Sequence, residues 1–158
     1  MSQRHKLLAL AAFLVLTFAA AALGSLATAR SVTTWMPTLN LPSFQPPSWL
    51  FGPVWTLLYA MMAVAAWLVY VRTGRTWSPA MVLFAAQLAL NALWSVLFFG
   101  LRRPDLAAAE IILLLALIVA TAIAFWRHSV LAGALMVPYA LWVSFATVLN
   151  IAIWRMNP

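Results

Sequence analysis

The sequence contains no cysteine, and Asp105 and Glu110 are the only acidic residues among its 158 positions. The lack of cysteine excludes disulfide bonds, thiolate metal sites and a cysteine nucleophile. Chemistry by paired carboxylates would have to come from these two neighbours alone. Charged residues make up only 7% of the chain, whereas a soluble domain has about 25%. A surface with so little charge cannot stay dispersed in water, which excludes the soluble globular classes.

Hydrophobic residues, by contrast, make up 66% of the sequence, and the mean hydropathy is +1.01. The nine lysines and arginines give a net charge of +7, but they stand singly or in pairs between long apolar runs. A nucleic-acid-binding protein would gather them into a basic stripe. Cations at the ends of apolar runs are instead typical of membrane spans, where anionic headgroups hold them. We therefore predict an integral, multi-pass membrane protein that contacts membrane lipids and no nucleic acid.

Apolar runs long enough to cross a bilayer recur along the whole chain. A spanning helix needs about 20 mostly apolar residues. In lipid every backbone donor needs an internal partner, so helices are the only plausible spans here. The predicted fold is an all-α bundle of five transmembrane helices in a single domain, residues 1–158. The expected helices cover residues 7–28, 49–71, 79–101, 105–126 and 131–155.

Prolines separate the first two of these helices. Proline removes a backbone donor and disfavours helix at the residue before it. Five prolines interrupt the uncharged stretch after Arg30, at positions 37, 42, 46, 47 and 53. We therefore expect residues 30–48 to form an extended loop between the first two helices.

The first apolar segment has a second interpretation. Arg4 and Lys6, the apolar run and then Ala27-Thr28-Ala29 resemble a signal peptide with a small-residue cleavage site. The run over 7–23 is longer than the usual core of about 7–15 residues, which favours a retained helix. With five spans, five cations share one side of the membrane and four the other, so their count does not orient the chain.

Three of the expected helices carry a stripe of aromatic or polar side chains on one face. Polar residues inside a bilayer are costly and are therefore functional candidates. Helical spacing places each set on one face, because residues three or four apart are neighbours. The stripes are Phe51, Trp55, Tyr59 and Met62; Gln87, Asn91, Trp94 and Phe98; and Tyr139, Trp142, Ala146, Leu149 and Asn150.

Simpler roles account for some of these residues. Asn91 and Asn150 have no titratable neighbour, so hydrogen bonding between helices is the favoured interpretation for both. Trp55 and Trp142 lie several residues inside their helices, where a stacking wall for a flat ligand explains them better than anchoring at the headgroups. Interface anchoring suits the tryptophans beside the turns and the chain end, which are Trp77, Trp126 and Trp154.

No motif for metal binding or catalysis accompanies these stripes. His5 and His128 fall at expected membrane edges without a third ligand, so we predict neither a metal site nor a cofactor. The sequence contains no GxSxG, HExxH, P-loop or GxGxxG pattern. The residues alone therefore predict a small helical membrane bundle with an aromatic pocket for a planar apolar ligand.

Three blocks of sequence resemble the TspO/MBR family, the tryptophan-rich sensory proteins related to the mitochondrial translocator protein. The first is LPSFQPPSWLFGPVWTLLY at 41–59. The second is AQLALNALW at 86–94 with FFG at 98–100. The third is PYALW at 138–142 with SFATVLN at 144–150. The blocks occur in the order that the family shows.

This resemblance implies a five-helix bundle, commonly a homodimer, whose ligand cavity is closed by the loop between the first two helices. It implies porphyrins such as protoporphyrin IX or haem as ligands, together with synthetic isoquinolines or benzodiazepines and, in many members, sterols. The family's paired pocket tryptophans fall on Trp55 and Trp142, and its loop tryptophan on Trp35. Its helix-3 amide and aromatic positions and its small pocket residue fall on Asn91, Trp94 and Ala146.

Two positions depart from the family pattern. Ile151 stands where the sterol-recognition segment of animal members has tyrosine, which weakens the prediction of a sterol ligand. Phe44 stands at a loop position that is usually tryptophan, so the contacts of the lid are expected to be softer. Members occur in bacterial membranes and in the mitochondrial outer membrane. The chain has no Arg/Ser-rich leader, so we expect a bacterial cell membrane.

We thus predict a membrane receptor or carrier that binds, and regulates or transports, porphyrins and similar flat ligands. An interfacial cation such as Arg30 would meet the carboxylates of a porphyrin. Two alternatives stay open: light-dependent porphyrin degradation guided by Trp55 and Trp142, and a regulatory scaffold whose partner is another membrane protein. The candidate ligand-binding residues are Trp35, Trp55, Tyr59, Gln87, Asn91, Trp94, Phe98, Trp142, Ala146 and Leu149.

Overall fold

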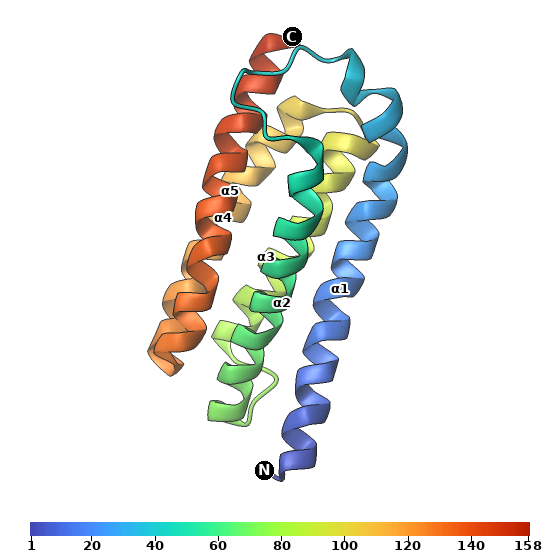
Figure 1. Ribbon diagram of the computed structural model, residues 1–158. Helices are drawn as coiled ribbons and strands as arrows, with labels where there is room; N and C mark the ends of the chain where they lie inside the picture. Colours follow the sequence, from blue (N-terminus) through green and yellow to red (C-terminus); the bar gives the residue numbers. More distant parts are fainter.

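Five long helices lie side by side in the computed structural model, which describes residues 1–158. Figure 1 shows that consecutive helices run in opposite directions, with the two termini at opposite ends of the bundle. All five are long and apolar enough to cross a membrane. The predicted all-α, multi-pass membrane fold is therefore confirmed. The helices are α1 (Gln3–Thr34), α2 (Ser48–Thr73), α3 (Pro79–Ser95), α4 (Pro104–His128) and α5 (Val130–Met156).

Local chemistry at the helix ends keeps the links short. The side chains of Ser78 and Ser129 accept hydrogen bonds from backbone N–H groups in the first turns of α3 and α5. Gly74 ends α2 in the left-handed conformation, with φ of 65°, which glycine adopts without steric cost. Ser129 alone separates α4 from α5. These two helices consequently form a tight antiparallel pair.

The loop after α1 is shorter than the sequence predicted. We expected the first helix to end near residue 28, but α1 continues to Thr34, so Arg30 is helical. No proline or glycine lies between Gly24 and position 37 to stop it. The hydroxyl of Ser31 also donates to the carbonyl oxygen of Phe99 at 2.5 Å, which ties this extra turn to the bundle. A short 3₁₀ helix, Met36–Thr38, follows, and the extended lid is confined to residues 39–47.

The third span also differs from the uniform helix expected over residues 79–101. The α-helical part ends at Ser95, and a π-helical segment, Val96–Gly100, continues the span. The wider turn of a π-helix changes which side chains face inwards, and such segments are frequent at functional sites. The Leu101 N–H donates to the Val96 carbonyl at 2.8 Å and closes the segment. It carries Phe98 and Phe99 into the interior near the lid.

Apolar side chains fill the end of the bundle opposite the lid. Phe84 of α3 and Phe125 of α4 stack there with ring centroids 5.8 Å apart. Val69 and Met136 are fully buried against the same core. Burial of a side chain of this size contributes about 1.5–3 kcal/mol. The packed end of the bundle supplies the stability that holds the helices together. The lid end can therefore contain a cavity.

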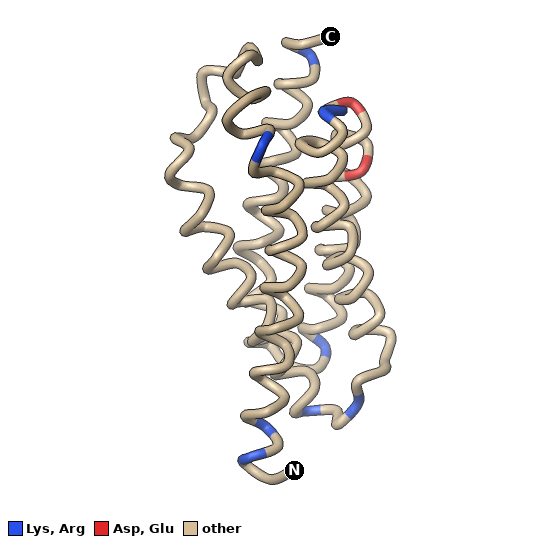
Figure 2. Tube along the Cα trace, turned by 90° about the vertical axis from the view of Figure 1, so that its right-hand side faces the viewer, with Lys and Arg blue, Asp and Glu red and all other residues tan.

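Charged residues are confined to the two ends of the bundle, as Figure 2 shows, with an uncharged band between them. This distribution is the one that a bilayer requires. Both acids lie at the lid end, where Arg103 forms an ion pair with Asp105 at 2.6 Å. The hydrogen bond from Arg103 to Asp105, and then the charge of that carboxylate, raise the pKa of Arg103. The pair closes the turn before α4.

Candidate functional site

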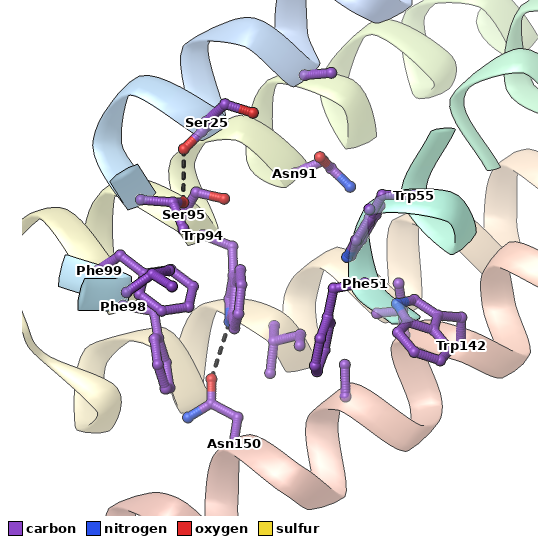
Figure 3. A pocket seen from close by; sticks show the side chains of 18 of the residues that line it. Ser25, Phe51, Trp55, Asn91, Trp94, Ser95, Phe98, Phe99, Trp142 and Asn150 are labelled. Carbon is purple, nitrogen blue, oxygen red and sulfur yellow. Dashed lines mark hydrogen bonds between the residues drawn. The ribbon is translucent and has the colours of Figure 1, made fainter. Parts of the chain in front are cut away.

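A cavity of about 790 Å³ lies at the lid end of the bundle. Its walls come mainly from α1, α2, the end of α3 and α5, and 19 of its 29 lining residues are hydrophobic. Pockets for small molecules measure about 300–1,000 Å³ and are mostly apolar with a few polar groups. The hollow therefore has the size and composition of a ligand site. Figure 3 shows its aromatic side chains.

The α2 wall is the aromatic stripe that the sequence predicted. Phe51, Trp55 and Tyr59 line the cavity from successive turns of the helix. The rings of Trp55 and Tyr59 lie 5.6 Å apart, and Trp55 meets Tyr139 edge-on at 6.3 Å. Contacts of this geometry contribute about 0.5–1.5 kcal/mol beyond simple burial. The stripe is thus a continuous aromatic surface whose rings support one another.

The opposite wall combines Trp94 and Phe98 with α5. These two rings stack at 5.0 Å. The Trp94 Nε1–H donates to Asn150 Oδ1 at 2.9 Å, a bond drawn in Figure 3. The Asn150 side-chain amide in turn donates to the Pro104 carbonyl at 2.9 Å. Asn150 therefore links three helices, as the interpretation of this amide as an interhelical hydrogen-bonding group predicted.

A buried polar network closes the inner end of the cavity. The hydroxyl of Tyr59 donates to Asn91 Oδ1, and Asn91 Nδ2 donates to the Tyr139 hydroxyl at 2.7 Å. The Tyr139 hydroxyl donates to Gln87 Oε1 at 2.9 Å. Asn91 thus bonds to neighbouring helices while it also faces the cavity. The predicted interhelical hydrogen bonding of Asn91 is therefore confirmed, and a role in ligand binding stays a prediction.

Most of the predicted ligand-binding residues meet at this cavity, but two do not line it. Gln87 is fully buried beneath Tyr139, deeper in the core than its stripe indicated. Trp35 packs its ring edge-on against Phe98 at 5.7 Å, behind the wall. Arg30 also lies outside the lining. The residues that do line the cavity are Trp55, Tyr59, Asn91, Trp94, Phe98, Trp142, Ala146 and Leu149.

Sequence reasoning missed the contribution of α1. This helix presents small side chains to the cavity, including Ala21, Ser25 and Thr28. Their spacing of three or four residues places them on one face. Small residues on one face allow the wall to recede and leave room for a ligand. That spacing was visible in the sequence, but no aromatic or amide side chain marked it.

The lid contributes Gln45 to the lining and is tied to the end of α5. The backbone N–H of Asn40 donates to Asn157 Oδ1 at 2.9 Å, and Asn157 Nδ2 donates back to the Asn40 carbonyl at 2.9 Å. We call this reciprocal pair the amide clasp. Phe44 adds an edge-on contact with Phe145 at 6.3 Å. The lid is therefore closed over the cavity at two points.

Removal of the amide clasp is expected to loosen the lid. Each bond contributes about 0.5–1.5 kcal/mol, so Asn157→Ala should speed hydrogen exchange at the Asn40 amide roughly tenfold. Mass spectrometry of peptides covering residues 39–47 measures this directly. Pro158→Ala, which changes the neighbouring exposed residue, is the control and should leave exchange unaltered. Equal exchange in both variants would show that the clasp does not hold the lid.

Comparison with known proteins extends the similarity over most of the chain. The sequence model of the TspO/MBR family matches residues 12–155. A tryptophan-rich protein TspO from Chlorobaculum tepidum is 42% identical over 97% of this chain and 98% of its own length. One from Archaeoglobus fulgidus is 41% identical over 85% of this chain and 87% of its own. The human translocator protein is 39% identical over 78% of this chain and 75% of its own.

Proposed function

The chain belongs to the TspO/MBR family, and from this premise we propose that it is a membrane receptor or carrier for porphyrins and similar flat apolar ligands. One observation carries the proposal: a cavity of about 790 Å³ among the membrane-spanning helices, walled by indole rings from three different helices. Those rings belong to Trp55, Trp94 and Trp142. A flat macrocycle matches walls of flat aromatic rings better than a flexible chain does.

The polar groups of the cavity define how such a ligand would lie. Trp142 Nε1 and Gln45 Oε1 are both buried without a hydrogen-bond partner, and both side chains line the cavity. A ligand that accepts from the indole and donates to the amide would satisfy both atoms. No lysine or arginine lines the cavity. The carboxylates of a porphyrin would therefore extend to the charged lid end, which carries Arg102 and Arg155.

Titration of protoporphyrin IX with the detergent-purified protein in dim light tests the proposal. The readout is the fluorescence anisotropy of the porphyrin itself. Quenching of tryptophan fluorescence would be unsuitable, because the variants remove tryptophans. Loss of two stacking contacts in Trp55→Ala/Trp142→Ala should raise Kd by about tenfold or more. The control is Trp77→Ala/Trp126→Ala, which removes two exposed tryptophans outside the cavity.

The cavity variant and the control variant together distinguish binding in the cavity, binding elsewhere on the protein and absence of binding. Saturable binding that weakens only in the cavity variant supports the proposal. Saturable binding that is equal in all variants would place the ligand elsewhere on the protein. Absence of saturation in the wild type would overturn porphyrin binding and leave the fold and family as they stand.

A further inference from the structure

A second hollow, of about 410 Å³, shares the Trp142 side chain with the cavity. It is a groove between α2 and α5, and we call it the α2–α5 groove. Leu57 and Leu141 on its two sides are 61% and 66% exposed, so in this membrane protein they face the hydrocarbon of the bilayer. Its lining is entirely apolar: Val54, Leu57, Leu58, Met61, Pro138, Leu141, Trp142 and Phe145.

We propose that the flat apolar ligand passes between the bilayer and the cavity through the α2–α5 groove, with the Trp142 side chain as the movable wall. The inference rests on the proposed function, because it concerns the route of the same ligand. Trp142 lines both hollows, so displacement of one side chain would join them. The groove is thus a lateral vestibule of the cavity.

The contacts of Trp142 leave it free to move. Its Nε1–H is buried without an acceptor, whereas the indole of Trp94 is fixed by Asn150. The centroid of the Trp142 ring lies 5.8 Å from that of Phe51 and 5.7 Å from that of Phe145. Contacts between aromatic rings are weakly directional, and an unpaired buried donor costs about 1–3 kcal/mol. Reorientation of this ring therefore breaks no hydrogen bond.

The backbone beside the groove is also weakened. Pro138, one turn before Trp142, has no N–H to donate to the carbonyl of Ala134. Pro53 has the same effect in α2, just before Val54 of the groove. Helices bend most readily where such a bond is missing. Each helix that frames the groove therefore has a point where it can bend without breaking a hydrogen bond of its own backbone.

The lid is the rival route. It is held by the amide clasp and by the Phe44–Phe145 contact, and it opens towards headgroups and water. An apolar ligand partitions into the hydrocarbon, because burial of its surface is favoured by about 25 cal/mol per Å². A route through the groove keeps that surface in an apolar medium throughout.

Stopped-flow binding of protoporphyrin IX to the protein in phosphatidylcholine nanodiscs distinguishes the two routes. Leu141→Trp fills the groove and should slow association and dissociation alike, each on the order of tenfold, with Kd unchanged. Leu57→Trp fills it from the α2 side and should act in the same way. Leu113→Trp, at an exposed position of α4 away from both hollows, is the control. Asn157→Ala tests the lid.

Each outcome decides between the routes. Slower ligand association and dissociation in both groove variants, with the rates of Leu113→Trp and Asn157→Ala unchanged, support lateral passage. Unchanged rates in the groove variants, with faster ligand association and dissociation in Asn157→Ala, would overturn the groove route in favour of the lid. If the wild type shows no saturable binding, the proposed function itself fails and the route fails with it. A change of Kd in only one groove variant marks local damage, and the other variant then decides.

Discussion

Replacement of Gly133 by alanine is expected to destabilise the protein by about 2 kcal/mol or more, although alanine is the better helix former. A Cβ atom at position 133 would lie 2.6 Å from Trp126 Cε3 and 2.8 Å from Trp126 Cα. A side chain could turn away from such a contact, but a backbone atom cannot. Alanine gains about 1 kcal/mol in helix propensity, whereas overpacking of this kind costs about 1–3 kcal/mol and sometimes more.

The position of Gly133 makes relaxation difficult. Ser129 alone joins α4 to α5, and the Gly133 N–H donates to the Ser129 carbonyl at 3.0 Å. Added bulk must therefore separate the two helices at their junction. Thermal unfolding in detergent measures the effect. Gly52→Ala is the matched control, because nothing lies within 4 Å of the point that its Cβ would occupy, and the variant should be neutral or slightly stabilised. Equal melting temperatures for the two variants would contradict the steric argument.

The five-helix architecture followed from local information. Each span has a mean hydropathy of 1.7 or more in its best window, which is a property of consecutive residues and needs no tertiary structure. Helical periodicity likewise places Trp55, Trp94 and Trp142 each in a stripe of aromatic or polar side chains on one face of its helix. Features that repeat within one helix could therefore be predicted from the sequence.

Features that depend on how helices approach one another could not. The α1 wall consists of small residues such as Ala21 and Ser25, which look the same in sequence whether they face lipid or a cavity. Gln87 shares a stripe with Asn91, but only the packing of Tyr139 shows that it lies beneath the cavity rather than in its wall. The close contact at Gly133 is equally invisible, because Trp126 belongs to another helix.

Tyr139→Phe is expected to destabilise the protein by about 2 kcal/mol although it removes a single oxygen atom. Tyr139 is fully buried, and its hydroxyl serves both Asn91 and Gln87. Without it, Asn91 Nδ2 and Gln87 Oε1 lose their partners. Each unsatisfied buried group costs about 1–3 kcal/mol. Hydrogen bonds between membrane helices average only about 0.6 kcal/mol where the freed groups find new partners.

The surroundings of Gln87 decide whether the loss is nearer to about 1–3 kcal/mol or to about 0.6 kcal/mol for each hydrogen bond. Gln87 is fully buried, and its other side-chain contact is with the sulfur of Met62 at 3.7 Å, a weak acceptor. That sulfur cannot donate to the freed oxygen of Gln87, so the higher cost applies. Tyr139→Phe/Gln87→Met removes the orphaned oxygen at similar volume and should recover about half of the loss in thermal stability. A double variant less stable than Tyr139→Phe would contradict this argument, because it would show that the Gln87 side chain stabilises the protein even without its hydrogen bond to Tyr139. Recovery would show that the unpaired oxygen of Gln87 accounts for that half of the loss, and the unpaired amide of Asn91 for the rest.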